Sequence, residues 1–338
     1  MAMTIYDISK KAGVSIATVS RVLNGSENVR PSTRKKVMDV IDKYDYTPNA
    51  FARGMGLHSL KTIGILCADS SDLFLAKAVY FLEQELQANG YESLLCCTGY
   101  NLDIKKNYLN LILSKKVDSI ILVGSNFIGS TEDENQYIKD VSTQVPIMLL
   151  SASFDYPNVY STLCDDYGTM FEATTEMIQA GITDILYLYD SKSYSGLKKL
   201  HGFRDAMKEH NIPSFEKLIH FYDGNIEHLD EIADFVAGIA KKGASFHGIM
   251  TSDDSLAIGS IKYAQKKGIR IPEDLSVMGY NNSMLTNCCT PELTSVDNRL
   301  ETQTHQLVQT LLGVLAGEEM PKKSIFSGKI IKRGTTLF

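Results

Sequence analysis

Strand-like and helix-like segments alternate along the chain from residue 62 onward. Short apolar runs, such as 62–67 and 120–123, are followed by longer segments whose apolar residues recur at helical spacing. This alternation is typical of parallel strands joined by crossover helices, which cover both faces of the sheet. The sequence therefore predicts an α/β core of doubly wound parallel sheets, and its 338 residues leave room for two such lobes. Further strands are expected at 147–150, 184–189, 249–251 and 276–279.

The first 46 residues follow a different pattern, in which helical segments are short and close together. Apolar residues within 5–12 share one face of a helix that ends at Gly13, and Ser15 can cap a second helix over 16–23. A third helix begins at Pro31, a residue that is tolerated in a first helical turn. Two short helices joined by a tight turn and followed by a third predict an N-terminal helix-turn-helix head.

Charge is distributed unevenly between this head and the remainder of the chain. The first 60 residues carry nine Lys and Arg against five Asp and Glu, a net charge of +4, whereas the remainder has 25 against 35, a net charge of −10. Attraction to the phosphates of nucleic acid requires a local basic surface rather than a basic total. The charge pattern therefore favours DNA as the partner of the head.

The apolar pattern and the cysteines disfavour several classes of protein. No apolar run approaches the roughly 18 to 20 residues that span a bilayer. Polar residues near the N-terminus, among them Thr4 and Asp7, interrupt the apolar segment that a secretory signal needs, so we expect a cytoplasmic protein. Four of the six cysteines form two adjacent pairs, a spacing that suits neither a zinc site nor a disulfide. We expect buried reduced thiols, with no bound metal and no cofactor.

Motifs along the whole chain match those of a known family. They are Thr4-Ile5-Tyr6-Asp7-Ile8, Ala12-Gly13-Val14-Ser15, Ala17-Thr18-Val19-Ser20-Arg21-Val22-Leu23-Asn24, Val29-Arg30-Pro31-Ser32-Thr33-Arg34, Tyr46-Thr47-Pro48-Asn49-Ala50, Thr251-Ser252-Asp253-Asp254, Ile271-Pro272-Glu273-Asp274-Leu275-Ser276-Val277-Met278-Gly279-Tyr280-Asn281 and Arg333-Gly334-Thr335-Thr336. With these motifs the chain resembles the LacI/GalR family of repressors. The resemblance implies a pair of periplasmic-binding-protein-like lobes behind a DNA-binding head.

This resemblance also implies a division of the chain. Residues 1–46 are expected to form the helix-turn-helix head, and 47–60 a hinge helix or linker. The N-terminal lobe of the effector core is expected to consist of 61–161 with 292–322, and the C-terminal lobe of 162–291 with 323–338.

A helix that enters the major groove reads base edges through side chains near its N-terminus. Ile16 and Ala17 suit the methyl groups of thymine, Arg21 suits guanine, and the remaining polar residues of the head suit phosphates, which position the head without reading sequence. The DNA-contacting residues that we expect are Thr4, Tyr6, Ser15, Ile16, Ala17, Thr18, Ser20, Arg21, Asn24, Arg30, Asn49, Ala52, Arg53 and Met55.

The expected hinge is too short and too rich in glycine to form a stable helix by itself. The resemblance implies that it folds only when two copies meet on DNA and that Met55, where the family usually has Leu, enters the minor groove. Gly54 and Gly56 each raise the cost of that helix by about 0.5 to 1 kcal/mol. Two heads on a two-fold axis read a palindrome, so a homodimer is expected. A leucine heptad tail for helical tetramerisation is not seen in the sequence.

Ligands of doubly wound sheets bind at the carboxyl ends of strands, where this sequence offers several polar and aromatic residues. The candidates for effector contacts are Phe74, Asp165, Tyr189, Lys199, Asp253 and Asn281. Carboxylate and amide groups suit the hydroxyl groups of a sugar, and aromatic rings stack on its apolar face, so a sugar-like effector is expected. Each residue also has a structural alternative: the carboxylates cap helices, the asparagine forms a turn, the lysine is solvated, and the aromatic residues belong to the core.

Two of these candidates depart from the sugar-binding and purine-binding members of the family. Lys199 stands where they commonly have Arg, so that a point charge replaces a planar bidentate group, and Asn281 stands where they have Asp. Lys199, Asp253 and the stretch 28–33 also resemble the catabolite control branch of the family, whose corepressor is a phosphorylated carrier protein. A protein corepressor is therefore the alternative to a small-molecule effector.

Two other classes of function fit only parts of the sequence. Asp165 with Asp253 would be the carboxylate pair of a glycosidase, but the sequence has no Gly-rich phosphate loop, no nucleophile elbow and no His/Cys metal cluster. A transport-type sugar-binding protein shares the two-lobed fold but carries no DNA-binding head. We therefore expect a transcriptional regulator of the repressor type that is not an enzyme, with effector binding coupled to operator binding through movement of the lobes.

Overall fold

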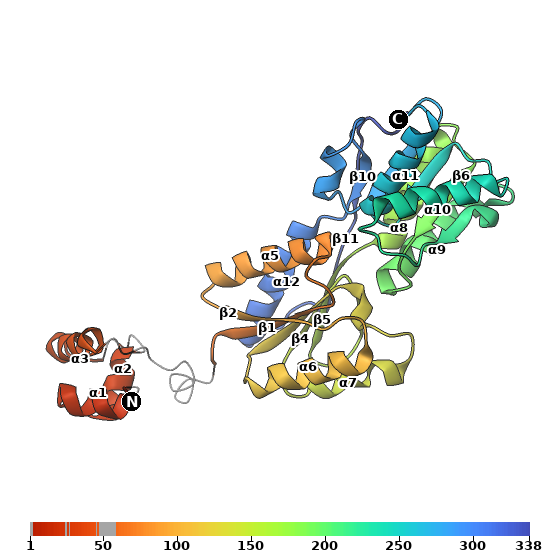
Figure 1. Cartoon of the computed structure of the whole chain (residues 1–338). Coiled ribbons are helices and arrows are strands. Elements are labelled where there is room, and N and C mark those ends of the chain that lie inside the picture. Colours follow the sequence, from red (N-terminus) through yellow and green to blue (C-terminus); the bar gives the residue numbers. More distant parts are fainter. Residues whose placement is uncertain (1–2, 24–25, 27, 45, 47–58) are drawn as a thin grey trace. The chain divides into compact units, whose positions relative to one another are not determined.

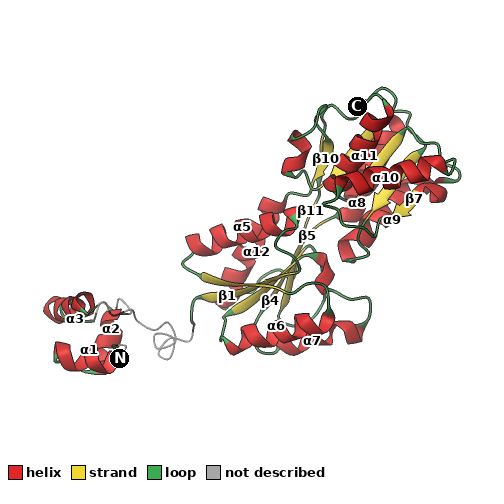
Figure 2. Ribbon diagram, viewed as in Figure 1, coloured by secondary structure: helices red, strands yellow, loops and turns green. Residues whose placement is uncertain are grey.

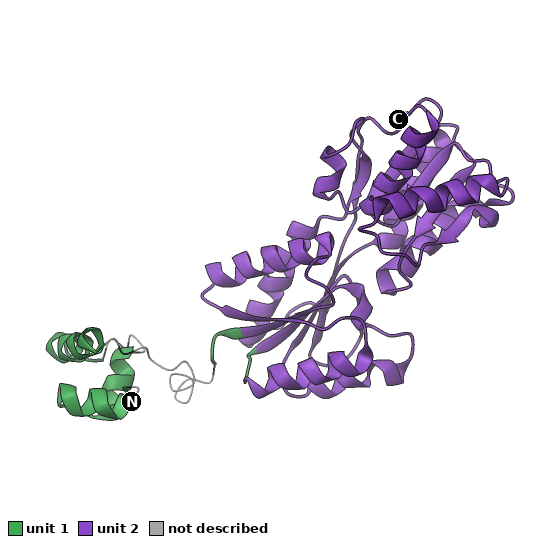
Figure 3. Cartoon of the chain, viewed as in Figure 1, with its two compact units in different colours: residues 1–62, 116–118 green, residues 63–115, 119–338 purple. Residues whose placement is uncertain are grey.

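The computed structural model describes residues 3–23, 26, 28–44, 46 and 59–338. The chain divides into two compact units, residues 1–62 with 116–118 and residues 63–115 with 119–338 (Figure 3). Among the described residues, no helix is long and apolar enough to cross a membrane.

In the first unit, three short helices pack around a small apolar core. They are α1 (Ile5–Ala12), α2 (Ile16–Leu23) and α3 (Pro31–Lys43). Their core consists of Ile8, Val19, Val22, Val29, Val37, Ile41 and Tyr46. Thr4 and Asp7 form a capping box at the start of α1, and Gly13 ends this helix with a φ of 65°. At the start of α2, the Ser15 Oγ accepts a hydrogen bond from the Thr18 backbone N–H. The predicted helix-turn-helix head is confirmed.

The second unit contains two lobes, each built on a six-stranded sheet. The first sheet has the order β11-β5-β4-β3-β1-β2, with β1 (Thr62–Cys67), β2 (Glu92–Cys97), β3 (Ser119–Val123), β4 (Ile147–Leu150), β5 (Val159–Cys164) and β11 (Lys323–Phe326). The helices α5 (Leu73–Ala88) and α12 (Leu300–Leu315) cover one face, and α6 (Leu102–Ser114) and α7 (Glu132–Ser142) cover the other (Figure 1). Leu82 and Leu311, from α5 and α12, share one buried cluster with Ile65 and Ile121 of the sheet.

The second sheet has the order β12-β10-β9-β8-β6-β7. Its strands are β6 (Ile185–Tyr189), β7 (Ile219–Phe221), β8 (Gly248–Thr251), β9 (Ser276–Tyr280), β10 (Thr294–Asp297) and β12 (Lys329–Ile331). The helices α8 (Asp166–Gln179) and α9 (Tyr194–Glu209) pack on one face, and α10 (Leu229–Lys241) and α11 (Asp254–Lys267) on the other (Figure 2). Successive side chains of β6 point to opposite faces of the sheet. Tyr187 packs with Phe203 of α9 on one face, and Leu188 packs with Ile232 of α10 on the other.

Short 3₁₀ turns complete the two lobes. They are η1 (Ser125–Phe127), η2 (Phe215–Leu218) and η3 (Met284–Asn287). Strand pairs in both sheets are parallel, for example β1 with β3 and β8 with β9, whereas β12 runs antiparallel to β10 at the edge of the second sheet. The predicted α/β core of doubly wound parallel sheets is therefore confirmed.

The chain crosses from one lobe to the other three times, and these crossings correct the expected lobe boundaries. Residues 162–164 complete β5 of the first sheet, and 323–326 form β11, which pairs with β5 there. Residues 294–297 form β10, which pairs with β9 of the second sheet. The expected division assigned each of these three segments to the other lobe. Pairing between strands that are distant in the sequence decides to which lobe a segment belongs, and this pairing cannot be recognised from the local sequence.

The cysteines also differ in part from expectation. All six are free, as expected, but only Cys67 and Cys164 are buried. Cys97 and Cys288 are exposed. Cys97 is the last residue of β2, the edge strand of its sheet, and Cys288 directly follows the short turn η3.

Candidate effector pocket and DNA-reading head

A pocket within the second unit collects side chains from both lobes. Asp72, Asn126 and Ser151 follow strands β1, β3 and β4 of the first sheet, whereas Asp190 and Asp253 follow β6 and β8 of the second. These five lining residues lie beyond the carboxyl ends of strands, where doubly wound sheets place their ligands. The volume of the cavity is about 150 Å³, and a cavity of this size is large enough for one six-membered ring.

Four of the six predicted effector residues line this pocket: Phe74, Lys199, Asp253 and Asn281. Two do not. The exposed Asp165 instead caps α8 by accepting a 3.0 Å hydrogen bond from the Gly168 N–H. Tyr189 packs beside Tyr187 and Phe221, with ring centroids 6.0 and 5.1 Å away.

In both cases the next residue along the chain lines the pocket. Asp166 takes the place expected for Asp165, and Asp190 takes the place expected for Tyr189. Tyr189 is the last residue of β6, and successive side chains of a strand point to opposite sides, so an error of one residue reverses the direction of the side chain. Asp165 instead caps α8, of which Asp166 is the first residue.

A chain of hydrogen bonds holds Asp253 and Asn281 in place. The Asn281 amide donates to the Asp253 Oδ2 at 2.9 Å, and the Asn298 amide donates to the Asn281 Oδ1 at 3.0 Å. The other oxygen of Asp253 caps α11 by accepting from the Ser255 N–H at 2.7 Å. Asn281 has a φ of 96°, a left-handed conformation in which Asn is tolerated better than most residues. Asp253 therefore caps a helix and also lines the pocket, and Asn281 has the backbone conformation of a turn and also lines the pocket.

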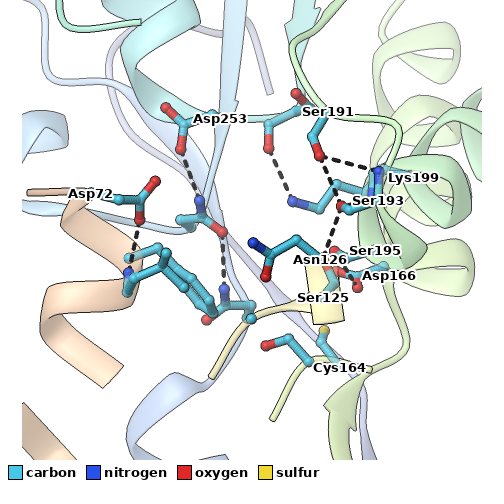
Figure 4. Close-up of a pocket in the computed structure, with 18 of the residues that line it drawn as sticks. Asp72, Ser125, Asn126, Cys164, Asp166, Ser191, Ser193, Ser195, Lys199 and Asp253 are labelled. Carbon is cyan, nitrogen blue, oxygen red and sulfur yellow. Dashed lines mark hydrogen bonds between the residues drawn. The ribbon is translucent and has the colours of Figure 1, made fainter. Parts of the chain in front are cut away.

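Lys199 is buried and fixed on the opposite side of the pocket (Figure 4). Its Nζ donates to the Ser252 carbonyl at 3.0 Å and lies 3.8 Å from the centre of the Tyr280 ring. Tyr280 donates from its hydroxyl group to Asp166 at 2.7 Å, and Ser195 donates to the other oxygen of the same carboxylate at 2.7 Å. Burial raises the pKa of Asp166, and the positive charge of Lys199 and these two hydrogen bonds oppose that rise.

Carboxylates on the other side of the pocket are also perturbed. Burial, together with the negative charges of Asp190 and Asp254, raises the pKa of Asp253 to about 7. Burial raises the pKa of Asp72. It also raises the pKa of Asp254, which lies next to Asp253 in the chain but does not line the pocket, to about 6. The pocket therefore holds acidic groups that ionise less readily than carboxyl groups in water.

A serine from each lobe meets beside the pocket (Figure 4). The Ser125 Oγ, just beyond β3, donates a 2.8 Å hydrogen bond to the Ser193 Oγ, which belongs to the cap of α9. The Ser191 Oγ donates to the same oxygen at 2.8 Å. Sequence reasoning missed these serines because their meeting depends on the approach of two lobes.

The head presents most of the predicted DNA-contacting residues that the structure describes. Those that are exposed are Thr4, Tyr6, Ser15, Ile16, Ala17, Arg21 and Arg30, and those that are partly buried are Thr18 and Ser20. Ile16 and Ala17 lie in the first turn of α2, and both are exposed, whereas Val19 and Val22 of the same helix are buried. Asn24, Asn49, Ala52, Arg53 and Met55 lie outside the described residues.

Two family models match the chain. Residues 4–49 match the model of bacterial regulatory proteins of the lacI family, and residues 174–336 match a periplasmic binding protein-like domain. A transcriptional regulator of the helix-turn-helix type from Lachnoclostridium phytofermentans is 50% identical, with 99% of this chain and 100% of the relative covered. Catabolite control protein A of Priestia megaterium is 33% identical, with 88% and 87% covered.

Solved structures show the same architecture. A lac repressor dimer bound to operator and the anti-inducer ONPF has a TM-score of 0.88 at 20% identity, with all of both chains covered. A helix-turn-helix head attached to a two-lobed core with a pocket between the lobes defines a DNA-binding transcriptional regulator rather than an enzyme. The chain belongs to the LacI family of bacterial regulatory proteins.

Proposed function

We propose that this protein binds a palindromic operator as a homodimer, with an affinity that a sugar-like effector modulates from the pocket between the lobes. One observation carries the effector half of the proposal: a single pocket takes side chains from both lobes, among them Phe74 from the first and Asp253 from the second. A ligand that contacts both lobes has a different affinity for each arrangement of the lobes. Such a difference is what shifts a conformational equilibrium.

Four of the predicted residues remain in the proposed effector site. Asp253 and Asn281 bind hydroxyl groups of the effector, and Phe74 packs on its ring. Lys199 fixes the position of Ser252 in the pocket wall by donating a hydrogen bond to its carbonyl group. Asp166 and Asp190 join them in place of Asp165 and Tyr189, which do not line the pocket.

The proposed DNA-reading surface is the N-terminal part of α2. Exposed Ile16 and Ala17 contact thymine methyl groups and Arg21 contacts guanine, while Thr4 and Arg30 are among the residues that contact phosphates. Support comes from the structural similarity to a repressor dimer that is bound to operator. Because the proposed role requires access to DNA, we infer a cytoplasmic location.

Selection from a random duplex library with the full-length protein tests the DNA half. We expect enrichment of one palindromic sequence, whose binding is then measured by fluorescence anisotropy. Arg21→Ala should bind this duplex more weakly yet keep ligand-dependent thermal stabilisation, whereas Asp253→Ala should bind the duplex and lose the response to ligand. If no sequence is enriched, or if Arg21→Ala binds the duplex as tightly as the wild type, the proposal fails.

A protein corepressor is the second candidate for the effector. It is favoured by the 33% identity to catabolite control protein A over 88% of the chain. Addition of a carrier protein in its phosphorylated and unphosphorylated forms to the anisotropy assay separates the two candidates. Tighter operator binding with the phosphorylated form alone, together with no response to any sugar, would establish the corepressor.

A further inference from the structure

We propose that the pocket selects an effector that combines hydroxyl groups with a protonated amine, such as an amino sugar, and that it excludes phosphorylated and other anionic ligands. This inference rests on the proposed function, because it names the chemical class of ligand for the same pocket. It is carried by the charges and the hydrogen-bonding groups that face the cavity.

Charge is the first argument. Among the described residues that line the pocket, four are carboxylic acids, Asp72, Asp166, Asp190 and Asp253, and one is a cation, Lys199. Asp72 belongs to the first lobe, whereas Asp190 and Asp253 belong to the second. Carboxylates that face one cavity from two lobes repel one another when they are ionised, and a positive charge between them both removes this repulsion and favours their ionised form.

The one lysine is already engaged. Its Nζ donates to the Ser252 carbonyl and lies over the Tyr280 ring, and its charge acts on Asp166. Figure 4 shows Lys199 and Asp166 on one side of the pocket, with Asp72 and Asp253 on the other. The acidic groups on that other side therefore lack a partner cation among the lining residues that the structure describes.

The neutral groups of the wall give a second and independent argument. The Gln303 Oε1 and the Asn298 Oδ1 are buried, belong to side chains that are at least nine-tenths buried, and accept no hydrogen bond from any described residue. Both residues line the pocket. Each amide nitrogen already donates elsewhere, Gln303 to the Asn298 carbonyl and Asn298 to Asn281. Asn126, which is less deeply buried, has both its amide oxygen and its amide nitrogen unpaired among the described residues. The wall thus presents three unpaired amide oxygens, which a donor from the ligand can satisfy, and one unpaired amide N–H₂ group.

Donor chemistry then narrows the class of ligand. A protonated amine offers three donors, no acceptor and a positive charge, and sugar hydroxyl groups offer further donors. A phosphate group offers acceptors and negative charge, so it meets repulsion from the carboxylates and leaves the amide oxygens unsatisfied. Binding of an amine by carboxylates from both lobes would also draw the lobes together, which links recognition to the conformational response.

Matched sugars test the inference with the full-length protein. Glucose, galactose and mannose are each compared with their 2-amino, N-acetylated 2-amino and 6-phosphate derivatives by titration calorimetry at pH 6.5, below the usual pKa of an amine. In at least one series, the amino sugar should bind about tenfold or more tightly than the parent and N-acetylated sugars, and the 6-phosphate should not bind. Preference for a neutral or phosphorylated member, or no binding in any series, would overturn the inference.

Two variants connect the preference to the pocket. Asp190→Asn keeps the shape and an acceptor for the Ser252 hydroxyl while removing one charge, so the preference for the amine should fall at least threefold. Asp69→Asn is the matched control, because Asp69 is a partly exposed residue near Asp72 that binds Ser71 and does not line this pocket. An amine preference that survives in Asp190→Asn, or that falls equally in Asp69→Asn, would count against the proposal.

Operator binding, followed in the same samples, separates this inference from the proposed function. If a phosphorylated sugar or a phosphorylated carrier protein changes operator affinity, the regulator model stands and the charge selection is wrong. If an amino sugar binds in the pocket without any effect on operator affinity, the inferred preference of the pocket for an amine is supported, but the proposed role of the ligand as an effector is wrong.

Discussion

Ser125 of the first lobe donates a 2.8 Å hydrogen bond to Ser193 of the second, beside the candidate effector pocket. Ser193 also belongs to the cap of α9, so the bond connects the end of β3 to the start of a helix in the other lobe. The arrangement of lobes in this structure is therefore one in which they already touch at the pocket.

Removal of this hydrogen bond should weaken effector binding. A typical intramolecular hydrogen bond contributes about 0.5 to 1.5 kcal/mol, so Ser125→Ala should raise the Kd of the effector roughly two- to tenfold, as measured by titration calorimetry. The exposed Ser130→Ala, nearby in the chain and outside the pocket lining, is the control. Unchanged affinity in Ser125→Ala would show that the bond does not favour the ligand-binding arrangement.

Arg21 and Arg30 should differ in how they contribute to DNA binding. If Arg21 contacts guanine, Arg21→Ala should cost about 1 to 3 kcal/mol and relax the preference at one base pair. If Arg30 contacts phosphate, Arg30→Ala should weaken binding to all sequences alike and reduce the slope of log K against log salt by about 1 per head. Anisotropy titrations with single-base operator variants at several salt concentrations distinguish the two. Equal behaviour of both variants would contradict the assignment.

The carboxyl group of Asp253 should make stability depend on pH. Because its pKa is raised from 3.8 to about 7, the folded protein binds more protons than the unfolded chain between these values, and the free energy of unfolding falls as pH rises through this window. Asp253→Asn has no carboxyl group at this position, so the free energy of unfolding of the variant lacks this decrease with rising pH. The Tm of the variant relative to that of the wild type should therefore increase from pH 5 to pH 8 in differential scanning fluorimetry.

The control for this pH effect is an aspartate with the opposite shift. Arg270 lowers the pKa of Asp274 to about 2, so its carboxylate is ionised throughout the range from pH 5 to pH 8. The Tm difference between Asp274→Asn and the wild type should stay constant over that range. A constant difference for Asp253→Asn as well would show that Asp253 ionises normally.

Two helical glycines should respond oppositely to alanine. A Cβ at Gly202 in α9 would overlap the Tyr167 backbone carbonyl of α8, whereas nothing lies within 4 Å of a Cβ at Gly238 in α10. Gly202→Ala should therefore destabilise the protein by about 1 to 3 kcal/mol, and Gly238→Ala should stabilise it by about 0.5 to 1 kcal/mol. Denaturant unfolding of both variants measures the difference. If Gly202→Ala proves as stable as the wild type, α8 and α9 are packed less closely than the structure shows.

Elements whose pattern is local could be predicted from the sequence, and those that depend on distant partners could not. The helices of the head and the buried strands β1, β3 and β4 were expected, because short apolar runs and caps mark them. Strands β5, β10, β11 and β12 were not, although β5 and β10 are largely buried. Each is short or mixed in polarity, and each adds to its sheet next to a strand distant in the sequence or at an edge.

The candidate site shows the same limit on a smaller scale. Asp253 and Asn281 follow recognisable strands, so their place in the pocket could be anticipated. The sequence predicts Asp165 rather than Asp166 in the pocket, because it does not show which of two adjacent carboxylates caps the helix. Asp72 carried a visible signal, an aspartate before an apolar helix, but that signal indicates a cap and says nothing about a cavity.

The three crossings between the lobes have a consequence for how the protein can be divided. Neither lobe corresponds to one uninterrupted stretch of the gene, since β5, β10 and β11 lead the chain back and forth between the sheets. No single truncation can yield either lobe intact, and a protease that cuts one crossing leaves the lobes tethered by the other two. The two lobes therefore form a single unit, and recombination between genes can transfer or delete them only together.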